Sequence, residues 1–551
     1  MAWWDDLWLN EGFATWMQNQ ATDHFNPAWQ VWAREDRAKQ AAMDLDVRST
    51  THPIQHPIKD PAEAASAFDM ITYVKAAEII RMIEAYLGET SFRAGIRRYM
   101  ADHQYSNTTT ADLWDALEQA SGQPIGSIAS IWTRQPGFPL IHARTDCAPG
   151  RCTLLLSQER FTVHDPGAAP LQWPVPLTFA LTQDDRSRKS YLLSSQVAQL
   201  NLGGTGPVKL NLGNQGYYRV QYAPADRAAL LEQFARLGPE DRLNLLADAW
   251  ALVHGARASA VDYLSLLDRL QGKTDTAAWE QVIATLEEID RLEQGQAGRA
   301  AYRSYARSVL HPLYARLGWD ASAGEAEIVA PLRSSVLTAL GQFDDEAVIA
   351  EARERFADFV SAETSLPANL RPAVFSIVGR HADRPTYDRL HELARSAHST
   401  EQKDLLYEAM GLAQDPDLAA QTLALSLTEE VEPHLASSLA IWVAGPGEHA
   451  EAAWGFLEAH REALLAKLSF FGRYRYVARL ADSFNDQAHA SELMQFARSN
   501  LPEEAMPEIK KAAERIELRD ILRRRELPKV DAWVCGRIPE EDRRRMPSCG
   551  G

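Results

Sequence analysis

Apolar residues recur at intervals of three and four over roughly the first 138 positions, which is the spacing of one buried helix face. The clearest stretches are residues 7–21, 73–87, 91–103 and 110–121. A threonine before the last of these, Thr109 or Thr110, is a candidate N-cap. The pattern therefore predicts a helical N-terminal segment over residues 1–138.

Between residues 139 and 222 the pattern changes to alternation of apolar and polar residues. Short alternating runs are separated by clusters of Gly, Pro, Asp and Asn, which are typical of turns. The runs cover residues 152–156, 177–181 and 208–212. This arrangement predicts a small β-sandwich domain.

From residue 223 to residue 551 helical spacing returns in stretches of roughly 10 to 20 residues. Examples are residues 227–237, 239–254, 277–292, 346–359, 402–412, 450–465 and 507–524. Helix after short helix predicts an α-solenoid-like (HEAT/armadillo-like) array in which each pair buries its face on the next. The sequence has no clean repeat period, so the repeat would be degenerate. The fold class is therefore mostly α with a small β-sandwich.

Residues 3–14, Trp-Trp-Asp-Asp-Leu-Trp-Leu-Asn-Glu-Gly-Phe-Ala, form the most distinctive stretch. It resembles the segment that carries the third zinc ligand in the aminopeptidase N and puromycin-sensitive aminopeptidase family of zinc metallopeptidases. Glu11 matches that ligand by position. Any single Glu is more often a solvated helix residue, but the string of Trp, Asp and Asn-Glu-Gly around Glu11 favours the ligand.

A second stretch, residues 68–77, reads Phe-Asp-Met-Ile-Thr-Tyr-Val-Lys-Ala-Ala and resembles the FDxxxYxKGA segment of the same family. Tyr73 matches the tyrosine that donates a hydrogen bond to the oxyanion formed during hydrolysis. Ala76 stands where the family has Gly. Residues 132–139 and 216–222 resemble two later family segments, the exit from the catalytic domain and a strand of the β domain.

The HExxH motif, which supplies two histidine ligands and the general base, is absent from the chain. The nearest match, residues 391–395, reads HExxR, and His398 lies two helical turns from His391, too far to share one ion. His52 and His56 each precede a proline, which favours an extended backbone, and we interpret both as structural.

The resemblance implies a remnant of a thermolysin-like catalytic domain over residues 1–138, a β-sandwich over 139–222 and a helical C-terminal domain over 223–551. It implies a zinc-dependent aminopeptidase that removes N-terminal residues from peptides, and it assigns no substrate-binding residue in this chain. We expect a truncated form, inactive alone, that does not bind zinc tightly. A separate polypeptide could supply the missing N-terminal half.

An alternative from another functional class is a non-catalytic scaffold, in which the solenoid and β-sandwich bind partner proteins. Net charge and hydropathy each disfavour a class of function. The formal net charge of −18 disfavours nucleic acid and anionic membrane surfaces, and no apolar run is long enough for a membrane-spanning helix. We expect a soluble protein.

The chain has four cysteines. Cys147 and Cys152 flank Ala-Pro-Gly-Arg and either form a disulfide across a hairpin or remain thiols. The compartment is therefore open: cytoplasmic, or periplasmic or extracellular if the disulfide forms. Cys535 and Cys549 look incidental, and the basic run 543–545 is expected to be disordered.

Overall fold

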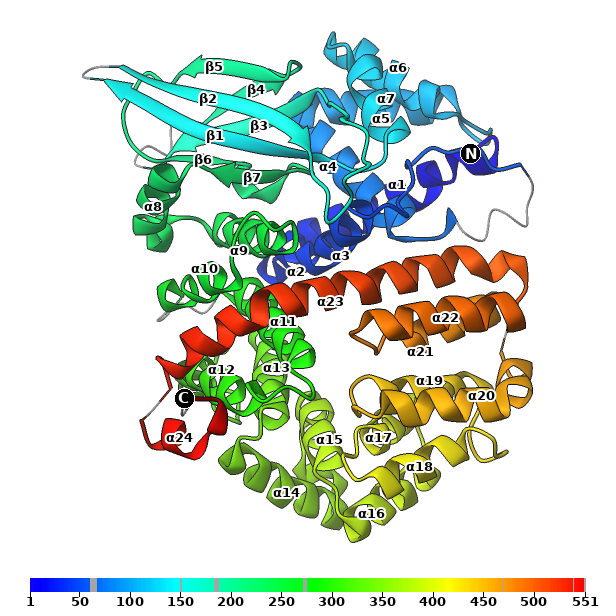
Figure 1. The fold of residues 1–551 in the computed structure, drawn as a ribbon. Helices are drawn as coiled ribbons and strands as arrows, with labels where there is room; N and C mark the ends of the chain where they lie inside the picture. The colour runs from blue at the N-terminus through cyan, green and yellow to red at the C-terminus, as the bar shows by residue number, and fades with distance from the viewer. Residues whose placement is uncertain are drawn as a thin grey trace. The chain divides into compact units, whose positions relative to one another are not determined.

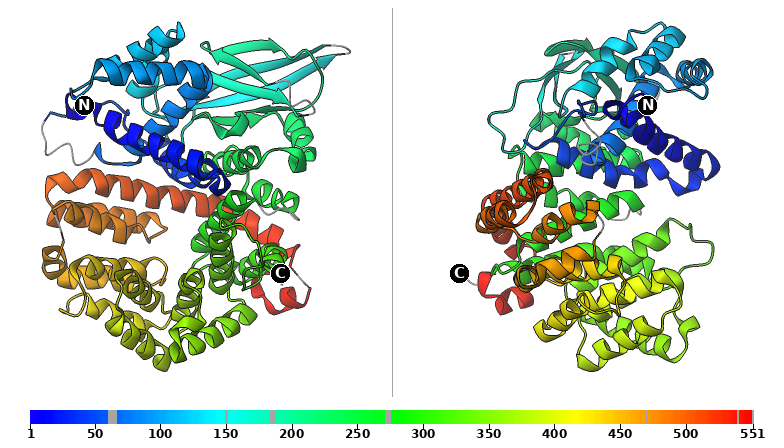
Figure 2. Two further views of the ribbon diagram at one scale, coloured as in Figure 1. Left: turned by 180° about the vertical axis from the view of Figure 1, so that it is seen from behind. Right: turned by 90° about the vertical axis from the view of Figure 1, so that its right-hand side faces the viewer.

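The computed structural model describes residues 1–59, 67–148, 151–182, 188–270, 275–468, 470–538 and 540–549. The chain divides into two compact units, Met1–Val282 and Ile283–Gly551. Figure 1 and the two views of Figure 2 show the elements of each unit.

The first unit begins with helices whose apolar faces form one core. Trp8 of α1 and Trp114 of α6 are both buried and stack on each other, with ring centroids 5.4 Å apart. Thr109 caps α6 in a capping box with Asp112, as the sequence indicated. The elements are α1 (Trp8–Phe25), α2 (Val31–Arg34), α3 (Asp36–Asp46), the π-helical turn η4 (Ile71–Lys75), α4 (Ala76–Leu87), α5 (Glu89–Asp102), α6 (Thr110–Ser121) and α7 (Ile125–Arg134).

Two facing sheets follow, and their inward side chains form a second core that includes Leu140, Leu154, Leu177 and Leu210. One sheet has the order β5-β2-β1-β7 and the other β4-β3-β6; β1 and β7 run parallel, whereas the other neighbouring strands run antiparallel. The strands are β1 (Pro139–Ala148), β2 (Arg151–Arg160), β3 (Val175–Leu181), β4 (Lys189–Leu193), β5 (Val197–Asn201), β6 (Val208–Leu210) and β7 (Arg219–Tyr222).

Buried charged side chains join the sandwich to the helices on either side of it in the sequence. Lys39 of α3 is buried and donates to the carbonyl oxygens of Asn214 (2.7 Å) and Gly216 (2.9 Å) in the loop before β7. Arg219 of β7 pairs with Asp248 of α9 at 3.4 Å. The helices after the sandwich are α8 (Pro224–Glu232), α9 (Pro239–His254), α10 (Ala260–Leu264) and α11 (Thr276–Leu292), the last of which crosses the boundary between the units.

The second unit consists of helices that pack mainly on their neighbours in the sequence. α16 packs on α17, α18 on α19 and α19 on α20, while the long α23 returns to contact both α12 and α22; Figure 2 shows this array from two further sides. The helices are α12 (Arg299–Leu317), α13 (Val329–Gln342), α14 (Glu346–Ser361), α15 (Arg371–Arg380), α16 (Arg384–Ser396), α17 (Thr400–Gly411), α18 (Pro416–Leu425), α19 (Pro433–Ala444), α20 (Ala450–Ala466), α21 (Phe470–Ala481), α22 (Gln487–Asn500), α23 (Met506–Cys535) and α24 (Glu540–Arg545).

The fold class expected from the sequence is confirmed: a mostly helical chain, small sheets within residues 139–222 and a long helical C-terminal part. The three domain boundaries stay a prediction. Among the described residues, no helix combines the length and apolar character that a membrane crossing needs.

All four cysteines form disulfides. Cys147 pairs with Cys152 across the β1–β2 hairpin, whose turn residues 149–150 lie outside the described residues. Cys535 pairs with Cys549, so the interpretation of these two as incidental was wrong. The basic run expected to be disordered lies at the end of the short helix α24, between the two members of this second disulfide.

Candidate active site

Glu11 lies near the start of α1, a helix held in the core by tryptophans on two sides. Trp8 is buried against α6 and donates from Nε1 to Thr110 Oγ1 at 2.9 Å. Two turns later Trp16 is buried against α4, where its Nε1 donates to Glu84 Oε2 at 3.0 Å. These anchors fix the rotation of α1 about its axis and therefore the direction of the half-buried Glu11 carboxylate.

Tyr73 lies in η4, the π-helical turn that leads directly into α4. Asp69 holds the start of this turn, since its carbonyl oxygen accepts from the Tyr73 N–H at 3.2 Å and its Oδ1 from the Ile71 N–H at 2.9 Å. Such turns are rare and often occur at functional sites. Helical periodicity predicted a helix from residue 73 onwards and gave no sign of the π turn.

The structure brings the side chains of Glu11 and Tyr73 together. The Tyr73 hydroxyl lies close enough to the Glu11 carboxylate for the two groups to interact electrostatically. Burial, and then this negatively charged neighbour, raise the pKa of the Tyr73 hydroxyl above its ordinary value of 10.0. The phenol therefore keeps its proton at neutral pH and can donate to an oxygen on which negative charge develops.

A glycine allows α1 and α4 to approach closely enough for this contact. A Cβ built on Gly12 would lie 2.4 Å from Ala76 Cβ and 3.3 Å from the Thr72 carbonyl oxygen. Gly12 is next to Glu11, and Thr72 is next to Tyr73, so this close helix contact lies beside the pair. Ala76 fills the space opposite Gly12, where the family segment has Gly.

Sequence reasoning missed two carboxylates that hold the site residues in place. Asp69 accepts a bond from the Ile71 N–H at the start of η4, and its other carboxylate oxygen lies 2.8 Å from His52 Nε2. Asp46, the last residue of α3, pairs with Lys75 at 2.7 Å, and both side chains are fully buried. Asp69 lies in the stretch that resembles FDxxxYxKGA, although sequence reasoning gave it no role, whereas no motif marks Asp46.

The two N-terminal histidines considered as ligands have other partners. His52 Nδ1 lies 2.8 Å from the carbonyl oxygen of Pro53, while its Nε2 binds Asp69. The His56 ring packs against the His52 ring in a tilted arrangement, with ring centroids 4.5 Å apart. Because His52 Nε2 is bonded to Asp69, this nitrogen is not free to bind a metal ion.

The HExxR stretch of α16 has partners of its own. His391 Nε2 hydrogen-bonds Glu430, whose Oε1 also accepts from the Tyr407 hydroxyl at 3.0 Å. Glu392 is exposed and pairs with Arg389 on the same helix at 2.8 Å. The His and Glu of this stretch thus face different neighbours.

The residues of this chain do not by themselves fit a catalytic zinc, which usually takes three protein ligands and a water. Among the described residues no three His, Cys, Asp or Glu side chains lie close enough together to hold a metal ion. Glu11 supplies one carboxylate, and its observed neighbour is a phenol. A zinc site that includes Glu11 would therefore need further ligands besides the side chains that the described residues bring close to it.

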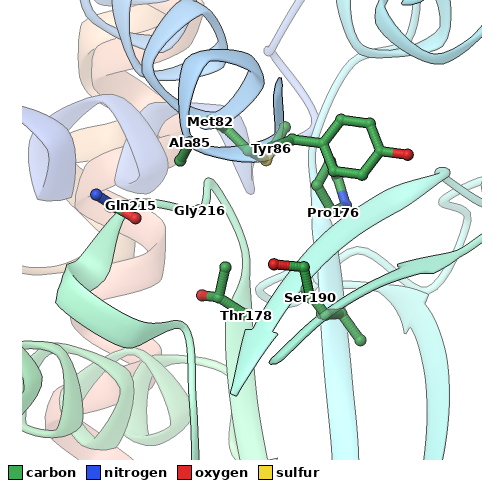
Figure 3. Close-up of a pocket in the computed structure, with 9 residues that line it drawn as sticks. Met82, Ala85, Tyr86, Pro176, Thr178, Ser190, Gln215 and Gly216 are labelled. Atoms are coloured by element: carbon green, nitrogen blue, oxygen red, sulfur yellow. The ribbon is translucent and has the colours of Figure 1, made fainter. Parts of the chain in front are cut away.

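Figure 3 shows a separate pocket between α4 and the β4-β3-β6 sheet. Two of its polar groups are engaged within the protein: Gln215 Oε1 accepts from Arg188 at 2.9 Å, and Thr178 Oγ1 accepts from the Leu212 N–H at 3.0 Å. Neither Glu11 nor Tyr73 lines it, so we assign it no part in the candidate site. The lining residues are Met82, Ala85, Tyr86, Pro176, Leu177, Thr178, Ser190, Gln215 and Gly216.

Comparisons with known proteins agree with these motifs. Residues 1–132 match the peptidase family M1 domain, and residues 207–518 match the ERAP1-like C-terminal domain. The second match alone covers more than half of the chain. The chain belongs to the M1 aminopeptidase family.

Curated M1 relatives align over most of this chain. Aminopeptidase M1-A of Oryza sativa subsp. japonica is 31% identical over 83% of the chain and 53% of its own length. Aminopeptidase M1 of Arabidopsis thaliana is 29% identical over 94% of this chain and 61% of its own length. The mitochondrial Aminopeptidase 2 of Saccharomyces cerevisiae is 29% identical over 85% of this chain and 49% of its own length. The chain thus spans about half to three fifths of the length of these M1 relatives.

Proposed function

We propose that this chain carries part of the machinery of a zinc-dependent aminopeptidase that removes N-terminal residues from peptides. Glu11 is the carboxylate ligand of the zinc, and Tyr73 is the donor to the oxyanion. The observation that carries the proposal is the proximity of these two side chains, which two separate motifs had marked independently. The relatives named above as aminopeptidases support the same reaction class.

Within this reaction, the chain's own groups do two things. The Tyr73 phenol, which keeps its proton because its pKa is raised by burial and by Glu11, donates to the oxygen of the scissile carbonyl as negative charge builds on it. Loss of one such donor typically lowers kcat by about 10²–10³. The Glu11 carboxylate, which lies beside Tyr73, is the group of this chain that would hold the zinc together with further ligands.

We further propose that the 551 residues alone bind no zinc tightly and hydrolyse no peptide. They contain no HExxH, and hence neither the two imidazoles nor the general-base Glu that this chemistry requires. The test is the zinc content after dialysis, together with hydrolysis of an aminoacyl p-nitroanilide. One tightly bound zinc per isolated chain would contradict the proposal.

A fusion protein tests whether Glu11 and Tyr73 support zinc-dependent peptide cleavage. The portion of the Arabidopsis Aminopeptidase M1 that precedes its match to this chain, joined upstream of Met1, supplies the missing motif. We expect the fusion to bind about one zinc and to cleave aminoacyl p-nitroanilides. A folded, zinc-loaded fusion without activity would instead favour the non-catalytic scaffold as the role of this chain.

A further inference from the structure

One buried ion pair joins three distant segments of the first unit beneath the candidate site. Lys75 Nζ lies 2.7 Å from Asp46 Oδ2, and both side chains are 0% exposed. Lys75 also donates to the Gly137 carbonyl oxygen at 3.0 Å, and Gly137 returns a bond from its N–H to Asp46 Oδ1 at 2.8 Å. Thr51 Oγ1 also donates to the same Asp46 oxygen at 2.7 Å.

Lys75 is the last residue of η4, two positions after Tyr73. Successive residues of a helix are rotated by about 100°, so positions two apart point in nearly opposite directions. The Lys75 ammonium points into the core toward Asp46, while the Tyr73 hydroxyl points toward Glu11. Because the two side chains share one short turn, a rotation of the turn that moves one must also move the other.

The turn itself is a backbone form that proteins adopt rarely and retain where the surroundings hold it. Asp69 fixes its beginning through the Ile71 N–H. The end of the turn is fixed by Lys75, which bonds to Asp46 and to the Gly137 carbonyl oxygen. A relaxation to regular α-helix would change the rotation between these two ends.

We propose that Lys75 and Asp46 are positioning residues, which set the rotation of the π-helical turn and so direct the Tyr73 hydroxyl toward Glu11. The inference rests on the proposed role of Tyr73 for its importance to the reaction. The claim that Lys75 and Asp46 orient Tyr73, however, can be tested on the folded chain without any catalytic measurement. If the pair contributed only to stability, folded variants without it would leave Tyr73 in place.

The test uses 3-fluorotyrosine placed at position 73 in the full chain, observed by ¹⁹F NMR at about pH 6, where the phenol is neutral. Glu11→Leu gives the reference shift for a hydroxyl that has lost its carboxylate neighbour. The test variant is the double replacement Lys75→Met with Asp46→Leu, because exchange of both charges for apolar groups leaves no buried charge unpaired. The matched control is Arg219→Met with Asp248→Leu, another buried pair of this unit that does not touch η4.

We expect the Lys75/Asp46 variant to show most of the fluorine shift seen with Glu11→Leu, and the Arg219/Asp248 control to retain the wild-type signal. An unchanged signal in a folded Lys75/Asp46 variant, or an equal change in the control, would overturn the inference. Thr51→Val, which removes one bond to Asp46 and keeps both charges, provides a milder variant should the double replacement not fold. It should shift the signal part of the way, and no shift would again count against the proposal.

These outcomes are independent of catalysis. The fluorine experiment can fail while the fusion of the previous section is active, in which case Tyr73 works without this anchor. It can also succeed while the fusion is inactive, in which case the anchor positions a tyrosine that has another role.

Discussion

At the scale of single residues, the contact between Gly12 and Ala76 sets how closely Glu11 and Tyr73 can approach. Any side chain at Gly12 must displace Ala76, because the added Cβ would lie 2.4 Å from it. Overpacking of this kind costs typically about 1–3 kcal/mol. The neighbouring Thr72 carbonyl oxygen, 3.3 Å away, leaves no other direction for relief.

We therefore predict that Gly12→Ala lowers the free energy of unfolding by about 1–3 kcal/mol, measured by urea denaturation. Gly455→Ala in α20 is the matched control, since no atom lies within 4 Å of its added Cβ, and it should stabilise by up to about 1 kcal/mol. Adding Ala76→Gly to Gly12→Ala should recover most of the loss. A Gly12→Ala variant as stable as the parent chain would refute this packing argument.

The candidate residues differ in how much of their position could be predicted from sequence. Glu11 and Tyr73 were found because each lies in a continuous and unusual run of residues. Asp46 could not be found in this way, because its partners Lys75 and Gly137 lie far along the chain. A long-range partner of a buried charge leaves no local pattern in the sequence.

At the scale of elements, a pair of carboxyl groups lies where the long helix α23 packs on the end of α11. Glu293, just after α11, is fully buried beside Asp531 of α23. Burial, and then the Asp531 charge, raise the pKa of Glu293; Asp290 raises it further, and Arg299 opposes the change. Glu293 is therefore protonated in the folded chain at a pH where the unfolded chain has lost that proton.

This arrangement predicts a pH dependence of stability. Because the folded state holds a proton that the unfolded state releases above about pH 4.5, the Glu293 contribution to stability falls as the pH rises through neutrality. Glu293→Gln cannot ionise and removes this fall. We expect thermal or urea unfolding to show the variant gaining about 1–3 kcal/mol on the parent between about pH 5 and pH 8.

The exposed Glu354→Gln serves as the control for Glu293→Gln and should follow the parent chain at every pH. A Glu293→Gln variant whose stability difference from the parent is the same at both ends of this range would show that the carboxyl is ionised in the folded state.

Element prediction succeeded where the buried face repeats regularly and failed where pairing is non-local. The helices over residues 110–121 and 239–254 were expected with the bounds that the structure has. β4 and β5 were missed because they are short, largely exposed and defined by their partners β3 and β2. The π turn escaped because it differs from an α-helix by one extra residue, which hydrophobic spacing does not resolve.

At the scale of the whole molecule, the two disulfides favour an oxidising compartment for this protein. Cys147–Cys152 ties the β1–β2 hairpin, and Cys535–Cys549 ties the C-terminal residues to the end of α23. Such bonds persist in oxidising compartments and are rare in the cytosol. We expect a non-reduced peptide map of the protein from its native source to contain both cross-links. Four alkylatable thiols would instead favour a reducing compartment.

The central claim is that Glu11 and Tyr73 serve one site with different tasks. The most direct test compares Glu11→Gln and Tyr73→Phe in the zinc-loaded fusion, with zinc content and kcat measured on the same samples. The account predicts that Glu11→Gln loses zinc on dialysis, whereas Tyr73→Phe retains about one zinc and loses about 10²–10³ in kcat. Full zinc retention by Glu11→Gln together with unchanged kcat in Tyr73→Phe would contradict it.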